Sequence, residues 1–219
     1  MFSRKELMKY RQIRYLTIGA GILLAIMLML ALFTSHRLDH TDEAFSQWVF
    51  TWRQPVLDTF FATVTDLAGA FGIIVLSTII VLTLVFYFHQ RTLAFWYALM
   101  MLVSNLLVNP LLKNVFQRER PALSVRLVEA GSYSFPSGHS LGAVTAFGGL
   151  MLILAYLYRN KNWRTPTNIG LLLLIGLIGF SRIYLGVHYL SDVLTGFALG
   201  AFCLGLSVEI LNRHVSNDS

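Results

Sequence analysis

Residues 113–121, KNVFQRERP, place two cations seven positions apart. Seven residues make about two turns of an α-helix, so we expect Lys113 and Arg120 to share one helix face and Pro121 to end the helix. Two cations on a common face can bind an anion. Taken alone, the segment is also compatible with a basic patch whose long side chains reach lipid headgroups.

Residues 133–140, YSFPSGHS, lead directly into an apolar run. Pro136 and Ser137 are typical of a helix start, and the N–H groups of a first helical turn are a natural seat for phosphate. Gly138 allows close backbone approach, and we expect His139 in the first turn to face a bound group. An ordinary helix cap with an incidental histidine is the alternative.

Residues 181–192, SRIYLGVHYLSD, add Arg182 and a histidine and a carboxylate four positions apart. We expect His188 and Asp192 to lie on one helix face, where Asp192 accepts a hydrogen bond from one imidazole nitrogen. The other nitrogen is then free to act as a nucleophile or as a metal ligand. A satisfied His–Asp pair at a membrane interface is the alternative.

The composition indicates which kind of structural element holds these three segments in place. Of the 219 residues, 56% are apolar and only 13% are charged, and the mean hydropathy is +0.63. A soluble domain carries about 25% charged residues, so both a soluble domain and a disordered chain are excluded. Six uncharged runs approach the roughly 20 residues that a membrane-spanning helix needs. These runs are residues 15–35, 67–88, 92–112, 140–158, 165–181 and 193–208.

We therefore expect an all-α fold, a polytopic bundle of six transmembrane helices. The first run is expected to be retained as a helix, because it is too long for a signal peptide and no A-x-A site follows. Between the first two runs, Phe45, Trp48, Val49 and Trp52 recur at helical spacing. They predict an amphipathic helix at the outer interface, with a plain loop as the alternative.

The distribution of Lys and Arg predicts the orientation. A cytoplasmic N-terminus places ten of the seventeen on the inner side, namely Arg4, Lys5, Lys9, Arg11, Arg14, Arg91, Arg159, Lys161, Arg164 and Arg213. The outer seven are Arg37, Arg53, Lys113, Arg118, Arg120, Arg126 and Arg182. Because basic loops stay inside, we expect both termini in the cytoplasm and all three polar segments at the external, periplasmic face of the cell membrane.

The convergence of three cations, two histidines, one aspartate and one helix start suits phosphoryl transfer. Cations stabilise the phosphoryl oxygens, one neutral histidine attacks phosphorus, and a second, protonated histidine supplies the leaving oxygen with a proton. Two histidines and a carboxylate could instead hold zinc or iron, but the nearby cations would repel a divalent ion. The single Cys203 excludes an internal disulfide, and the net charge of +6 is read as loop charge rather than as a nucleic-acid surface.

The three segments match the patterns K-x6-R-P, P-S-G-H and S-R-x5-H-x3-D. With them the chain resembles the type 2 phosphatidic acid phosphatase superfamily, the membrane lipid phosphate phosphatases. The resemblance implies that His188 is a nucleophile that forms a phosphohistidine, that Asp192 orients it, and that His139 is the general acid and then the base. It also implies a metal-independent reaction without a cofactor and the following phosphate-binding residues: Lys113, Arg120, Ser137, Gly138 and Arg182.

The resemblance implies a single integral-membrane phosphatase domain over residues 1–219, with its core motifs within 113–192. Among membrane members, the chain looks most similar to small bacterial enzymes of the phosphatidylglycerophosphate phosphatase B type. Those act on phosphatidylglycerophosphate, phosphatidic acid or undecaprenyl pyrophosphate, so we expect a phospholipid or polyprenyl phosphate as substrate. We expect no nucleic-acid partner, and the sequence leaves the oligomeric state open.

Two other functions use some of the same residues. A lipid-to-lipid phosphotransferase would employ the same phosphohistidine with a lipid acceptor in place of water. A lipid-phosphate binder or flippase without turnover would need the cations but not the paired His188 and Asp192, so the intact spacing disfavours it. Arg118 and Glu119 flank the predicted phosphate-binding residues. We expect them to form a solvated ion pair, with a role in tuning phosphate binding as the alternative.

Overall fold

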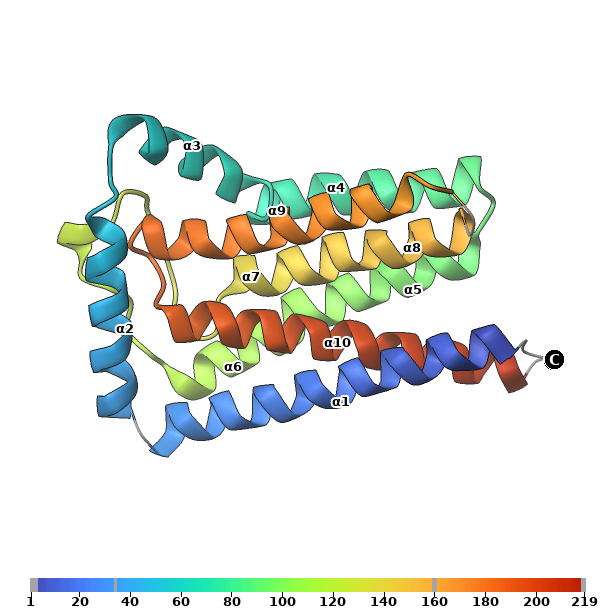
Figure 1. Cartoon of the computed structure of the whole chain (residues 1–219), viewed down its shortest axis with the longest axis horizontal. Helices are drawn as coiled ribbons and strands as arrows, with labels where there is room; N and C mark the ends of the chain where they lie inside the picture. Colours follow the sequence, from blue (N-terminus) through green and yellow to red (C-terminus); the bar gives the residue numbers. More distant parts are fainter. Residues whose placement is uncertain (1–3, 34, 159–160, 218–219) are drawn as a thin grey trace.

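Within the part of the chain that the structure describes, six helices are long and apolar enough to cross a membrane, and they run alongside one another in one bundle (Figure 1). The computed structural model describes residues 4–33, 35–158 and 161–217, and every regular element within these ranges is helical. The six candidate spans are Gln12–Phe33, Ala70–Tyr87, Arg91–Phe116, Gly138–Leu157, Arg164–Tyr184 and Leu190–Arg213. The expected all-α, six-span architecture is confirmed, and the spans deviate from the predicted runs by a few residues at their ends.

Three of the spans are single helices and three contain a π-helical turn. The single ones belong to α1 (Arg4–Phe33), α9 (Arg164–Tyr184) and α10 (Leu190–Asn217). The second span joins α4 (Ala70–Leu82) to the π-turn Thr83–Tyr87. The third runs from α5 (Arg91–Leu102) through the π-turn Val103–Val108 into α6 (Asn109–Phe116). The fourth runs from α7 (Gly138–Ala143) through the π-turn Val144–Gly148 into α8 (Gly149–Leu157).

The π-turn in the third span has a local cause in the sequence. Pro110 lies in the first turn of α6 and has no N–H to donate to the carbonyl four residues earlier, with which its ring would also clash. The helix accommodates the proline by widening over Val103–Val108, immediately before it. The span therefore continues past Pro110 and carries Lys113 to the end of the bundle.

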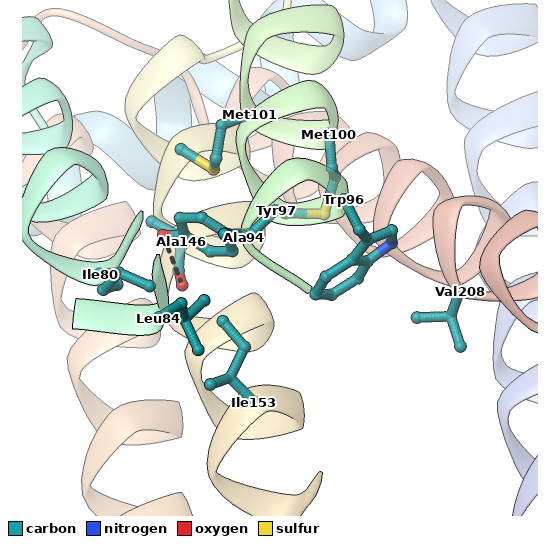
Figure 2. Packing of buried hydrophobic residues seen from close by; sticks show 10 residues of the cluster. All are labelled: Ile80, Leu84, Ala94, Trp96, Tyr97, Met100, Met101, Ala146, Ile153 and Val208. Atoms are coloured by element: carbon teal, nitrogen blue, oxygen red, sulfur yellow. Dashed lines mark hydrogen bonds between the residues drawn. The ribbon is translucent and has the colours of Figure 1, made fainter. Parts of the chain in front are cut away.

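The bundle core is apolar side-chain packing between α4, α5, the fourth span and α10. Figure 2 shows this cluster, in which the ring of Tyr97 is fully buried and its hydroxyl donates to the carbonyl of Ala146 at 3.4 Å. Other large apolar side chains face outward, as a surrounding hydrocarbon phase allows. The first helix packs along α10, so the first apolar run is part of the bundle.

Residues 35–66 form two helices at one end of the bundle rather than one amphipathic helix. Helix α2 (Ser35–Phe50) lies across that end, and α3 (Pro55–Asp66) packs against α9 (Figure 1). The aromatic pattern only partly describes α2, because Trp48 and Trp52 are about half exposed whereas Val49 is fully buried. The break falls at 51–54, where Arg53 donates two hydrogen bonds to the carbonyl of Tyr184 and Pro55 then starts α3.

The two ends of the bundle differ in what they carry. The beginning of α1 and the end of α10 lie together at one end, and α2 covers the other (Figure 1). This agrees with an even number of spans between them. Of the charges used to predict orientation, Arg159 lies outside the described residues, as do the side chains of Arg4, Lys5, Lys9, Arg11 and Arg37.

Candidate active site

The K-x6-R-P segment begins on a helix and leaves it before the arginine. Helix α6 ends at Phe116, because Gln117 adopts a left-handed conformation (φ 46°) and donates its N–H to the carbonyl of Lys113. The prediction that Lys113 and Arg120 share a helix face is therefore wrong. They nevertheless approach the same site, Lys113 from the last turn of α6 and Arg120 from the extended chain before Pro121, where a following proline disfavours helix.

Helix α7 begins at the P-S-G-H segment, as predicted. Ser137 is the N-cap, and its side chain accepts hydrogen bonds from the N–H (3.4 Å) and the hydroxyl (3.0 Å) of Ser140. A Cβ on Gly138 would lie 2.7 Å from the side-chain amide nitrogen of Asn109, so a larger residue would have to displace that side chain between α6 and α7. His139 lies in the first turn and is half-buried, close to four charged or titratable groups of the other two segments. These are Arg182, His188, Arg120 and Lys113.

The third segment places His188 just outside a helix rather than on one. Helix α9 ends at Tyr184, α10 begins at Leu190, and the turn between them contains Gly186 with φ +72°. The expectation that His188 shares a helix face with Asp192 is thus wrong in its local structure. The contact itself is present: His188 Nδ1 lies 3.3 Å from Asp192 Oδ2, and both side chains are buried.

Hydrogen bonds determine which nitrogen of His188 carries the proton. Arg120 Nη1 lies 3.0 Å from His188 Nε2, and a guanidinium can only donate, so Nε2 is the acceptor. The proton then sits on Nδ1, facing the carboxylate of Asp192. Burial, as the largest cause, lowers the pKa of His188 to about 3 against the opposing effect of Asp192. The imidazole is therefore neutral at neutral pH, with its lone pair at Nε2 among the cations.

Two of the three predicted cations are held by backbone carbonyls. Lys113 donates to the carbonyls of Tyr133 and Ser134, and Arg120 donates to those of Val187, Ser132 and Gly131. Burial is the largest cause that lowers the pKa of Arg120. These carbonyls keep both side chains extended toward the site.

Arg182 is the most buried of the three cations, with 4% exposure. Its Nη1 donates to Thr65 of α3 at 2.8 Å, whereas its Nε has no partner among the described residues. A buried guanidinium N–H without an acceptor is costly, so this nitrogen suits an anion that approaches from outside the chain.

Five polar residues around the histidine–aspartate pair were not predicted as site residues. Arg118 binds Asp192 Oδ1 at 2.7 Å, and Ser134 donates to Asp192 Oδ2. Asp39 and Asp42 of α2 and Ser191 of α10 complete the group around Arg118. The expected solvated ion pair of Arg118 with Glu119 is wrong, because the Arg118 side chain is only 16% exposed and pairs with three aspartates. In the sequence, the signal for this network was the pair Asp39 and Asp42, which lie one turn apart on a helix that we expected at the membrane interface.

This membrane bundle, with cations gathered near a neutral histidine, defines a class of membrane phosphatases. The PAP2 superfamily profile matches residues 93–216, more than half of the chain, and the chain belongs to this superfamily. It is a membrane-embedded lipid phosphatase, a hydrolase, and the expected family is confirmed.

Individual relatives agree with the family assignment. The chain is 32% identical to phosphatidylglycerophosphatase B of Bacillus subtilis (strain 168) over 187 residues, 82% of this chain and 88% of the relative. It is 36% identical to an undecaprenyl-diphosphatase of Sulfolobus acidocaldarius over 78 residues, 36% of this chain and 34% of the relative. The crystal structure of a transmembrane PAP2 type phosphatidylglycerolphosphate phosphatase from Bacillus subtilis superposes with a TM-score of 0.81 at 30% identity, covering 89% of this chain and 96% of that one.

Proposed function

We propose that the protein, as one domain over residues 1–219, hydrolyses a lipid phosphomonoester or pyrophosphate through a phosphohistidine formed on His188. The observation that carries this proposal is the arrangement around His188, whose Nε2 lone pair faces Arg120 while Nδ1 faces Asp192. A histidine so arranged is a nucleophile already in the required tautomer. The order of the groups, cation then imidazole then carboxylate, supports attack on a phosphate bound on the Arg120 side.

In the first step, the lipid phosphate binds among Lys113, Arg120 and Arg182, whose charges stabilise the phosphoryl oxygens. We infer that Ser137 and Gly138 at the start of α7 complete the phosphate-binding set. The donors of Arg120 turn from His188 Nε2 to phosphate oxygens, and Nε2 attacks phosphorus. The bond from phosphorus to the leaving oxygen breaks, and His139 gives that oxygen a proton. The products are a phosphohistidine and a lipid alcohol, or a lipid monophosphate when the substrate is a pyrophosphate.

In the second step, water attacks the phosphohistidine and gives a proton to His139, which is now neutral. The bond between phosphorus and Nε2 breaks, inorganic phosphate leaves, and His188 returns to its neutral form. Asp192 keeps its hydrogen bond to Nδ1 throughout and stabilises the positive charge that the ring carries as a phosphohistidine. No proton is gained or lost by Asp192.

We propose that this reaction needs no metal ion. Within the described residues, no group of three or more His, Cys, Asp or Glu side chains is arranged to hold one. Arg120 Nη1 lies 3.0 Å from His188 Nε2, on the side from which a divalent cation would have to approach, and the charge of Arg182 also acts on His188. The same charges favour a phosphate.

We propose that the site faces the periplasmic side of the cell membrane and that both termini are cytoplasmic. The ten-to-seven bias of Lys and Arg supports this orientation more strongly than its count suggests. Four of the seven cations on the other side are buried or half-buried near His188 and Asp192, namely Lys113, Arg118, Arg120 and Arg182. Only three then remain as loop charges on that side, against ten on the side of the two termini.

The relatives support two substrate classes. We infer that phosphatidylglycerophosphate is the first substrate to test, because the relative named for it matches most of the chain. Undecaprenyl pyrophosphate follows, since the undecaprenyl-diphosphatase shares a shorter stretch, and phosphatidic acid completes the series.

The test is phosphate release from these three lipids by detergent-purified protein in excess EDTA. We expect release by the wild type and its loss in His188→Ala. His40→Ala is the matched control, because this exposed histidine of α2 lies outside the proposed site and should leave release unchanged. Rapid acid-free quenching with labelled substrate should trap label on the wild-type protein but not on His188→Ala.

Three results would contradict parts of this proposal. Full release by His188→Ala would exclude His188 as the nucleophile. Loss of wild-type activity in EDTA, with recovery on adding a divalent ion, would exclude the metal-independent reaction. A phosphorylated lipid product in place of free phosphate would identify a phosphotransferase that uses the same intermediate.

A further inference from the structure

Arg118 joins three separate parts of the fold beside the proposed nucleophile. Its Nη1 donates to Asp192 Oδ1 and to Ser191 Oγ, both at 2.7 Å. Its Nη2 donates to Asp39 Oδ1 and Asp42 Oδ2 of α2, both at 2.7 Å. The planar guanidinium thus spans the first turn of α10 and the inner face of α2, a bridge that its fork of donors can make and a single ammonium cannot.

The two oxygens of Asp192 have different sets of donors. Oδ2 accepts from Ser134 Oγ, from the Tyr189 N–H at 3.0 Å and from His188 Nδ1. Among these contacts, Oδ1 has the guanidinium of Arg118 as its charged partner. Because Asp192 is fully buried, Arg118 is the cation that keeps this carboxylate ionised and sets its rotation about the side-chain bond. That rotation in turn fixes where Oδ2 meets His188.

Helix α2 holds Arg118 through one buried and one exposed carboxylate. The side chain of Asp42 is 3% exposed, whereas that of Asp39 is 49% exposed. Asp42 also accepts the N–H of Ser191 at 2.9 Å and its hydroxyl, so it satisfies a free N–H at the start of α10. The buried carboxylate therefore fixes both Arg118 and the helix turn that carries Asp192.

The electrostatic environment of Arg118 agrees with this geometry. Three carboxylates surround Arg118 and together raise its pKa, although burial acts in the opposite direction. The guanidinium also lies 4.5 Å from the centre of the Tyr189 ring, which covers it on one side. Arg118 is thus a permanent charge, immobilised by its bonds to Ser191 and the three aspartates.

We propose that Arg118, held by Asp42 of α2, is a positioning residue that fixes Asp192 and thereby the orientation and tautomer of His188. This inference rests on the proposed role of His188 and extends it to α2, which lies outside the segment that the family profile matches. It assigns to α2 a part in catalysis in addition to covering the end of the bundle. Arg118 itself does not contact the reacting phosphate.

The test compares kcat and KM for phosphate release by Arg118→Gln, Arg118→Lys and Asp42→Asn. We expect kcat to fall about 10- to 100-fold in Arg118→Gln, the effect of losing one charge-assisted hydrogen bond, with KM nearly unchanged. Arg118→Lys should not restore kcat, because one ammonium cannot bridge Asp192 and Asp42. The acid limb of the kcat/KM profile should move to higher pH in Arg118→Gln, because Asp192 is then less firmly ionised.

Matched controls separate positioning from general damage. Arg126→Gln alters another arginine of the same loop, one that donates to the carbonyl of Pro121, and should keep wild-type kcat. Asp39→Asn removes the exposed partner of Arg118 and should cost less than about threefold. Asp42→Asn should lower kcat without a full loss of folding, and its effect should not add to that of Arg118→Gln.

The failure of this inference is distinguishable from the failure of the proposed function. If His188→Ala still releases phosphate, the phosphohistidine proposal fails, and Arg118 cannot be acting through that nucleophile. If His188→Ala is inactive while Arg118→Gln and Asp42→Asn keep the wild-type kcat and pH profile, only the positioning role fails. Restoration by Arg118→Lys, or a loss confined to KM, would also overturn it.

Discussion

Replacing Asp192 with asparagine tests how the site holds its nucleophile, because this change keeps the shape and removes the charge. All four partners of the carboxylate are donors: three at Oδ2 and Arg118 at Oδ1. An asparagine NH2 group must therefore face a donor in either orientation. The less costly one places the amide oxygen toward His188 and the NH2 group against the guanidinium of Arg118.

The magnitude follows from the bonds that are lost or weakened. The charge-assisted bond to Arg118 is lost, and the bond to His188 Nδ1 loses its ionic component. At about 1.5–3 kcal/mol each, the two amount to about 3–6 kcal/mol. With about 1.4 kcal/mol for each factor of ten, kcat should fall about 10²- to 10⁴-fold. KM should change little, because the cations proposed to bind phosphate remain.

The assay is steady-state phosphate release in detergent micelles, with thermal unfolding measured on the same preparation. Asp58→Asn is the matched control, because Asp58 accepts a hydrogen bond from the hydroxyl of Tyr184 at 2.7 Å, which an amide oxygen can also accept. We expect that control to keep its activity. If Asp192→Asn retained more than about a tenth of the wild-type kcat, the reasoning about its four donors would be refuted.

Two further predictions concern pH and the turn before the nucleophile. His188 must be neutral to attack, and its pKa is lowered to about 3, so protonation should not reduce kcat/KM near pH 6.5. The kcat/KM profile should therefore show no loss of activity between about pH 7 and pH 5, and an acid limb centred on 6.5 would contradict this. Gly186→Ala places a Cβ 2.3 Å from the carbonyl of Val125 at a φ of +72°, and should lower the free energy of unfolding by at least about 2 kcal/mol. Gly170→Ala, with nothing within 4 Å of the added Cβ, should unfold like the wild type in the same denaturation experiment.

The spans could be predicted because each depends mainly on its own composition. An apolar run bounded by charges has few alternatives to a transmembrane helix, and all six were found. The three motif segments could be predicted for a similar reason, since their spacing is local. The secondary structure of these segments could not be predicted, because the end of α6 depends on Gln117 adopting a left-handed conformation that its residue type disfavours.

What the sequence did not reveal are contacts between distant positions. Helix α2 was expected to lie at the interface, yet Asp42 faces Ser191 and Arg118 inside the protein. The break after α2 depends on Arg53 reaching the carbonyl of Tyr184, 131 positions away. No periodicity within residues 36–66 encodes these partners, because they are determined by how α9 and α10 pack against that segment.

The partners of Arg118 are also synthesised at different times, because they lie on both sides of it in the sequence. Asp39 and Asp42 precede Arg118 by 79 and 76 positions, whereas Asp192 follows it by 74. A nascent chain that extends just beyond its third span therefore already contains the guanidinium and both carboxylates of α2, while the last three spans are still to come. Asp192 can thus be inserted beside a cation whose earlier counter-ions are present. Arg118 and its counter-ions on α2 are therefore present during biogenesis before His188 and Asp192 are synthesised.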